Sequence, residues 1–143
     1  MIKIPSIQDY EQYDGAHCHN LYRQTGPNWR CPACGRSRYH VMRWTNRCSR
    51  LKGKYEGWMI GLHKHHDHSV EDINKLIKNE GTRFPLTIIC DQCNSADGRI
   101  KTKLHLPKNF SFSPSELRQF ITPTNHGEHH INYEKAAEVF ACL

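Results

Sequence analysis

Four histidines within six residues are the side chains of this chain best suited to chemistry: His63, His65, His66 and His68. Imidazole titrates near neutral pH, so it can act as a general base, and it is also a common metal ligand. A single histidine would usually be structural, whereas four so close together favour a metal or acid–base site. Hydrolysis of a phosphodiester needs both functions, because a base deprotonates water while a cation stabilises the phosphate and the departing oxygen.

Two Cys-x-x-Cys pairs flank these histidines and predict a structural zinc site. The pairs are Cys31 with Cys34 and Cys90 with Cys93. Zinc favours four thiolates in a tetrahedron, and a pair spaced by two residues can supply two adjacent corners from one turn. The long separation between the pairs leaves other arrangements open. Those arrangements would use thiols or imidazoles outside the pairs: His17, Cys18, His19 or Cys48. Cys142 is expected to be a small apolar residue in a packed C-terminus.

The composition suits a small domain that is cross-linked by metal. The chain has 143 residues, of which 37% are hydrophobic, and a mean hydropathy of -0.77. Chains this polar often use metal to stabilise a small core. Seven cysteines, an odd number, fit metal binding better than a disulfide framework. With no secretory signal and no apolar run of about 18 residues, we expect an intracellular protein with reduced thiols and no membrane partner.

The basic charge is concentrated in one segment, which favours nucleic acid as the partner. The net charge is +6, and residues 15 to 55 contain no Asp or Glu. Arginine can bond two phosphate oxygens at once, and interleaved aromatic rings can stack on bases. A solvated basic face is the alternative. The residues predicted to contact DNA are Arg36, Arg38, Arg43, Arg47, Arg50, Lys52 and Lys54, with Arg99 and Lys101 further along the chain.

Two apolar runs are predicted to be strands that carry these residues. The first is Gly57 to His66, in which hydrophobic side chains alternate between two faces. The second is Phe84 to Cys90, rich in β-branched residues, where Pro85 indicates an edge or a strand start. The stretch from Val41 to Arg50 is compatible with either a strand or a helix.

Helices are predicted between and after these strands. Ser69 begins the first, with Asp72 as its capping-box partner, and Gly81 ends it. A short helix is expected from Cys93 to Arg99, directly after the second strand.

The two ends of the chain are predicted to be mainly helical. Helices are expected at Ser6 to Tyr13, at Ser113 to Ile121 and at Tyr133 to Cys142. The second has a strong start signal, because a capping serine precedes a proline in the first turn and a glutamate three residues on. Thr122 to Ile131 is expected to be a loop. Its histidines are open to three readings, as a second metal cluster, loop residues or DNA contacts: His126, His129 and His130.

Residues 31 to about 103 resemble an HNH (ββα-metal) endonuclease, most of all the phage endonuclease VII type. The matching features are the two Cys-x-x-Cys pairs, the histidines from His63 to His68, and the run from Cys90 to Gly98. By this resemblance His66 is the general base, while His65 and Asn94 hold a catalytic Mg²⁺ or Mn²⁺. The four paired cysteines would then bind the structural zinc.

The chain departs from that family pattern at two positions. The endonuclease VII type has Asp as its first metal ligand, where this chain has His65, as in colicin-type and some restriction nucleases. Imidazole accepts softer ions than a carboxylate does, so the preferred ion stays open. The middle Asn of the motif is also missing before the second strand, which leaves Asn74 or Asn79 to brace the loop. Because neighbours in a strand point to opposite faces, His65 and His66 can share a site only where the strand ends or bulges.

The sequence therefore predicts an α+β single domain with a zinc-stapled ββα-metal core at residues 31–103. Residues 1–30 and 104–143 would supply target recognition or dimer contacts, and a homodimer is one way to cut both strands. The expected function is a metal-dependent double-stranded DNA endonuclease, such as a restriction or phage enzyme, in a bacterial or phage-infected cell. The alternatives are a non-catalytic zinc-stabilised DNA-binding module, a Holliday-junction resolvase and an RNA-directed nuclease.

Overall fold

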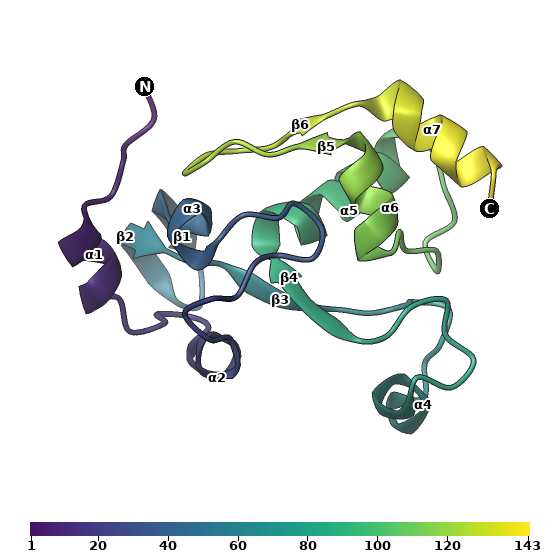
Figure 1. The fold of residues 1–143 in the computed structure, drawn as a ribbon, viewed down its shortest axis with the longest axis horizontal. Helices are drawn as coiled ribbons and strands as arrows, with labels where there is room; N and C mark the ends of the chain where they lie inside the picture. The colour runs from purple at the N-terminus through teal and green to yellow at the C-terminus, as the bar shows by residue number, and fades with distance from the viewer.

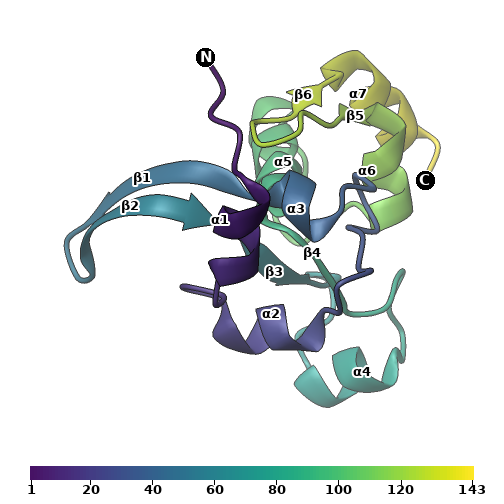
Figure 2. The ribbon, with the colours of Figure 1, turned by 60° about the vertical axis from the view of Figure 1, so that its left-hand side comes forward.

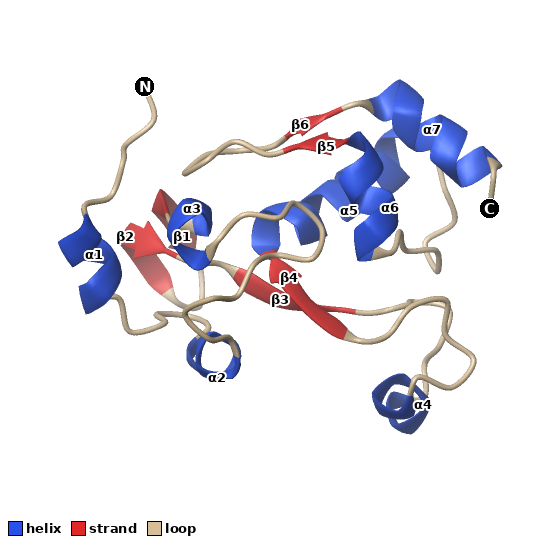
Figure 3. Ribbon diagram, viewed as in Figure 1, coloured by secondary structure: helices blue, strands red, loops and turns tan.

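The chain folds as an α+β protein with seven helices and three two-stranded antiparallel sheets (Figures 1 and 3). The computed structural model describes residues 1–143. The elements are α1 (Ile7–Gln12), α2 (His19–Gln24), α3 (Arg38–Val41), β1 (Arg43–Ser49), β2 (Gly53–Met59), β3 (Leu62–His65), α4 (Ile73–Lys78), β4 (Thr87–Cys90), α5 (Asp91–Lys103), α6 (Pro114–Phe120), β5 (Ile121–Thr122), β6 (His130–Ile131) and α7 (Tyr133–Ala141).

Strands β1 and β2 form a hairpin that projects from the body of the protein as an arm (Figure 2). Most side chains along β1 are exposed, and its first half is anchored by buried Thr45. A cross-strand pair of Trp44 and Trp58, with ring centroids 5.1 Å apart, stiffens the base of the arm. Gly53 opens β2 with a φ of 75°, a conformation that glycine adopts without steric cost. Within the stretch from Val41 to Arg50, which was compatible with a strand or a helix, Arg43–Ser49 form strand β1 and Val41 ends α3.

The predicted strand from Gly57 to His66 is wrong as a single element. It is divided between β2 and β3, which belong to different sheets, and the chain changes direction at Gly61. The Gly61 carbonyl accepts a hydrogen bond from the Asp91 backbone N–H at 2.9 Å. A Cβ atom on Gly61 would lie 2.2 Å from the Asp91 carboxylate, so a larger residue at this break would force the Asp91 side chain to move.

Strand β3 pairs with β4, and α5 begins directly where β4 ends. The register places Leu62 opposite Cys90 and His65 opposite Thr87. Strand β3 ends at His65. Helix α5 is longer than the short helix expected from the sequence, with 13 residues from Asp91 to Lys103. It packs against both strands and lies between this hairpin and the C-terminal elements (Figures 1 and 2).

Capping residues set the ends of most helices, as the sequence indicates. Ser6 and Ser113 both close capping boxes, at the starts of α1 and α6. The prediction for the start of helix α4 is wrong, because Asp72 is the N-cap of this helix and not the capping-box partner of Ser69. The helix therefore starts later than predicted, since the Asp72 side chain accepts a hydrogen bond from the backbone of Asn74.

The core joins the β3–β4–α5 unit to the C-terminal helices. Ile89, Ile100, Phe112 and Leu117 are fully buried members of one cluster of 18 residues. The predicted loop from 122 to 131 connects two short paired strands, β5 and β6. Cys142 is exposed, so the expectation of a packed thiol there is wrong, because α7 ends at the surface. None of the helices combines the length and the hydropathy needed to cross a bilayer.

Candidate functional site

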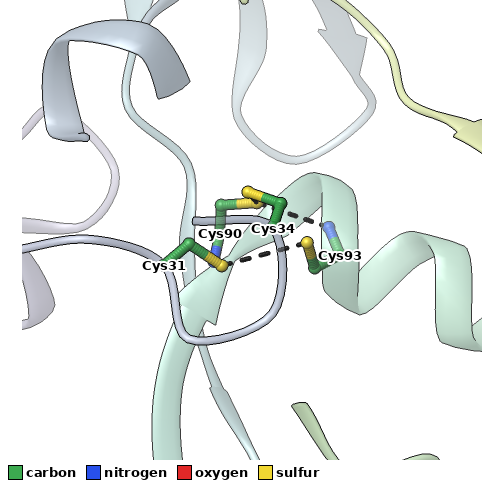
Figure 4. Close-up of side chains that lie close together, drawn as sticks. All are labelled: Cys31, Cys34, Cys90 and Cys93. Atoms are coloured by element: carbon green, nitrogen blue, oxygen red, sulfur yellow. Dashed lines mark hydrogen bonds between the residues drawn. The ribbon is translucent and has the colours of Figure 1, made fainter. Parts of the chain in front are cut away.

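The four paired cysteines come together in one cluster, as the sequence predicts (Figure 4). Their sulfur atoms all lie within 4.8 Å of one another. The Cys31 and Cys93 sulfurs are 3.9 Å apart, and those of Cys34 and Cys90 are 3.8 Å apart. Tetrahedral zinc with Zn–S bonds of about 2.3 Å places its sulfurs about 3.8 Å apart. The cluster could therefore hold a structural metal such as zinc.

Two local backbone turns position the four cysteines. Cys31 and Cys34 lie in a tight turn closed by a 2.8 Å hydrogen bond from the Gly35 N–H to the Cys31 carbonyl. Cys90 is the N-cap of α5, and its sulfur accepts a hydrogen bond from the Cys93 backbone N–H at 3.4 Å. One pair of thiols thus comes from a loop and the other from the junction of β4 and α5. The rival ligands are elsewhere, since Cys48 is exposed on the arm and the Cys18 thiol donates to the Leu62 carbonyl at 3.6 Å.

The thiols also polarise one another. Hydrogen bonds from Cys31, Cys90 and Cys93 hold the pKa of the Cys34 thiol below its ordinary value. The pKa of Cys93 is raised by hydrogen bonding to Cys31, Cys34 and Cys90 and by burial.

Arg36 belongs to this cluster and not to a DNA-binding surface, which corrects the sequence prediction. The residue is only 3% exposed. Its guanidinium donates to the Cys34 sulfur at 3.3 Å and to the Cys90 sulfur at 3.4 Å. Burial by itself would lower the pKa of Arg36, but its interactions with the Cys90 and Cys34 sulfurs hold it above the ordinary value. The positive charge of Arg36 therefore interacts with cysteine sulfurs in the interior of the protein.

The second candidate centre lies at the end of β3, where His65 is 1% exposed. The His65 ring stacks on Phe84 with centroids 5.1 Å apart. Its Nε2 atom lies 2.6 Å from the Phe112 carbonyl oxygen, which can only accept, so Nε2 carries the proton. The Nδ1 atom is then a lone-pair acceptor, and it is buried without a hydrogen-bond partner.

The other histidines of the run surround this end of the strand. His66 is half-buried, and its ring centroid is 4.4 Å from that of His68. His68 is hydrogen-bonded to the Ser111 hydroxyl. Burial, followed by the positive charges of Lys101 and His66, lowers the pKa of His68. The pKa of His63 is also lowered, first by burial and then by the neighbouring imidazoles of His65 and His66.

Asn94 lies in the first turn of α5 and lines a cavity of about 410 Å³. The cavity is bounded by the arm on one side and by the β3–β4–α5 unit on the other. His63 lines it as well, whereas His65 and His66 do not. Its wall mixes cationic, imidazole, amide and carboxylate side chains: His17, Arg47, Lys52, His63, Asp91 and Asn94.

The residues predicted to contact DNA fall into two groups. Arg38 is half-buried, and its guanidinium bonds the hydroxyls of Tyr10 and Tyr22 and the carbonyl of Thr25. Arg43 is also half-buried, and the Lys101 ammonium pairs with Asp97 at 3.0 Å. The exposed members are four residues of the arm and one residue of α5: Arg47, Arg50, Lys52, Lys54 and Arg99.

Asp67 braces the connection between β3 and β4, a structural role that the sequence prediction missed. Its buried carboxylate accepts hydrogen bonds from the Arg83 backbone at 2.9 Å and from the Ser69 backbone at 3.0 Å and hydroxyl at 2.7 Å. These bonds tie together the two ends of the long connection between β3 and β4. Asn79 bonds Thr82 and ends α4 in a left-handed conformation, so it braces the connection only locally. The Asp-x-Ser spacing, typical of an Asx turn, is the sequence signal for Asp67.

Comparisons with models of protein families, with curated proteins and with solved structures gave no match to this chain.

Proposed function

We propose that this protein is a metal-dependent DNA endonuclease with His66 as the general base and with His65 and Asn94 as ligands of a divalent ion. The observation that carries the proposal is the state of His65, whose Nε2–H donates to Phe112 while its buried Nδ1 has no partner. Metal-binding histidines typically donate their second ring nitrogen to a carbonyl or carboxylate in this way. A buried acceptor without a partner costs about 1–3 kcal/mol, and a bound cation would remove that cost.

The position of His66 supports a role beside that ion. Strand β3 ends at His65, so His66 is released from the strict alternation of faces that would send neighbouring side chains apart. His66 is half-buried and is still reached by solvent. A neutral imidazole nitrogen of His66 would take the proton from the attacking water, and the half-buried ring would hold it during the reaction. A divalent ion bound there would polarise the phosphate and stabilise the leaving oxygen.

The arm and the cavity beneath it support nucleic acid as the substrate. Residues 15–55 contain no acidic side chain, and this segment includes the whole of β1 and the turn of the arm. Arg47 and Lys52 of the arm line the cavity together with Asn94. Cations on this wall of the cavity would hold a phosphate backbone beside Asn94, one of the two proposed ligands. We propose double-stranded DNA as the substrate, cut by one site per chain, so that cutting both strands takes two chains or two nicks.

A plasmid-nicking assay tests this function. Supercoiled plasmid is incubated with Mg²⁺ or Mn²⁺ and either the unchanged protein, His66→Ala, or His130→Ala as a control for loss of an exposed imidazole on β6. We expect His66→Ala to nick about 10²- to 10⁴-fold more slowly, the usual contribution of a general base, while still binding DNA. The control should nick normally.

Other results would replace the proposal. Equal nicking by the His66→Ala variant and the unchanged protein would remove His66 from the mechanism. DNA binding without nicking by any of the proteins would indicate a non-catalytic zinc-stabilised DNA-binding module. Parallel reactions with RNA and with a four-way DNA junction distinguish an RNA-directed nuclease and a junction resolvase.

A further inference from the structure

Arg36 connects the thiol cluster to a distant part of the chain. Its guanidinium donates to the Cys34 and Cys90 sulfurs on one side. On the other side it donates to the Thr124 carbonyl at 2.9 Å and to the His40 carbonyl at 3.4 Å. Thr124 belongs to residues 121–131, which comprise β5, β6 and their connecting loop and are called the C-terminal hairpin below.

His129 of the C-terminal hairpin also lies against the thiols. Its Nε2 atom is 3.3 Å from the Cys93 sulfur and 3.8 Å from the Cys90 sulfur. The four cysteine sulfurs already make up a complete tetrahedral set, and His129 lies outside that set. The same Nε2 atom also lies 3.4 Å from the Arg36 guanidinium, so His129 touches both the thiol cluster and Arg36. The opposite ring atom, Nδ1, is buried without a partner.

We propose that Arg36 and His129 form an outer shell around a zinc–thiolate centre, and that this shell makes zinc binding and docking of the C-terminal hairpin one coupled event. The proposal rests on the structural metal site and does not depend on nuclease activity. It assigns both residues as positioning residues that stabilise the thiolates.

Electrostatics explains why the cluster needs such a shell. Four thiolates around Zn²⁺ leave a net negative charge, and Cys31, Cys90 and Cys93 are buried. A buried charge is costly unless it is paired and hydrogen-bonded. Arg36 supplies a positive charge at two sulfurs, and His129 packs its Nε2 atom against a third sulfur and against the Arg36 guanidinium. The guanidinium fork can satisfy sulfurs and carbonyls at once, which a lysine ammonium does with fewer donors.

The same contacts explain the coupling to the hairpin. His126 adds two bonds at the far end of the hairpin, from its N–H to the His40 carbonyl at 2.9 Å and from Nδ1 to the Met42 carbonyl at 2.8 Å. Bound zinc would hold the four sulfur atoms in place, and the sulfurs would in turn hold the side chains of Arg36 and His129. These two side chains connect the thiol cluster to the C-terminal hairpin. Thermodynamic linkage is reciprocal, so a hairpin that stabilises the zinc must itself be stabilised by zinc.

Zinc affinity tests the outer shell. The full chain is loaded with zinc, and the metal is withdrawn by competition with a chromogenic chelator. We expect Arg36→Met and His129→Phe each to bind zinc about 10- to 100-fold more weakly, the usual effect of losing an outer-shell partner. Arg118→Met is the matched control, because the Arg118 guanidinium donates to the Ala33 carbonyl at 3.3 Å within the same turn but contacts no sulfur.

Thiol labelling distinguishes this role from general loosening of the fold. Zinc-loaded protein is briefly exposed to N-ethylmaleimide, and each cysteine is quantified by mass spectrometry. Labelling of Cys34 and Cys90 should rise first in Arg36→Met, and labelling of Cys93 in His129→Phe. An equal rise at all four thiols, or unchanged zinc affinity in both variants, would overturn the proposal. If Arg36→Met does not fold, Arg36→Lys, which keeps the charge and fewer donors, and His129→Phe carry the test.

Hydrogen exchange tests the coupling. Backbone amides of the C-terminal hairpin and of the residue after it, 121–132, are compared in zinc-loaded and chelator-treated protein. We expect the amides of Asn132 and His126, which donate to Phe120 and His40, to lose protection when zinc is removed. Loss of protection confined to the Cys31 turn and the start of α5, with the hairpin unchanged, would refute the coupling.

Discussion

The arm offers a quantitative test of nucleic-acid binding through two lysines near its tip. Lys52 and Lys54 are exposed, and neither is paired with an acidic side chain. Arg47 is a poorer choice, because it already pairs with Asp91 at 3.2 Å and would have to exchange that partner for phosphate. The perturbation is therefore the double substitution Lys52→Gln with Lys54→Gln.

The expected magnitude follows from counterion release. Each phosphate contact contributes about -0.9 to the slope of log affinity against log salt on duplex DNA. Two lost contacts should make the slope shallower by about 1.8. Between 50 and 200 mM salt, the unchanged protein should then lose about 12-fold more affinity than the double variant.

The assay is fluorescence anisotropy of a labelled DNA duplex at several salt concentrations. The control is Lys75→Gln with Lys78→Gln on α4, which removes the same net charge from exposed positions far from the arm (Figures 1 and 2). A general effect of net charge would change both slopes equally. Equal slopes for the two double variants would refute the reasoning, since the arm would then make no particular phosphate contacts.

Three further predictions concern the core, one ion pair and the thiol centre. Phe112→Ala should destabilise the fold by about 3–5 kcal/mol in urea unfolding, because Phe112 is fully buried; a cost below about 1 kcal/mol would contradict its place in the core. Burial would raise the pKa of Glu116, but hydrogen bonds from Arg83 and the Ser113 N–H lower it overall. The ion pair between Arg83 and Glu116 therefore stabilises the protein at pH values above the unfolded pKa of about 4.3. Glu116→Gln should therefore cost about 1 kcal/mol at pH 7, a difference that shrinks as pH falls through the lower folded pKa; a gap independent of pH between 7 and 3 would rule this out. Cys90→Ser should abolish stoichiometric zinc binding and lower the melting temperature, and a variant that retains both would exclude the four-thiol site.

Local chemistry accounts for what the sequence could predict. A capping serine and its acidic partner lie three residues apart, so the starts of α1 and α6 were predictable from neighbours alone. The two Cys-x-x-Cys pairs predict their own cluster because four thiols suit one tetrahedral ion. The alternation of apolar residues from Gly57 to His66 was equally clear. It did not reveal the break at Gly61, where the contacts come from Asp91 in another element.

The roles of the charged and imidazole side chains were decided by contacts that no local pattern contains. Arg36 looks like any other residue of a basic segment, yet its partners are Cys90 and Thr124, 54 and 88 residues away. His65 is set apart from its neighbours by the carbonyl of Phe112, 47 residues on, which occupies one nitrogen and leaves the other free. The sequence by itself determined which residue types are available and where helices can start. Only the tertiary structure decided which charges are buried and which nitrogen is unpaired, because burial and hydrogen bonding depend on segments that meet only when the chain is folded.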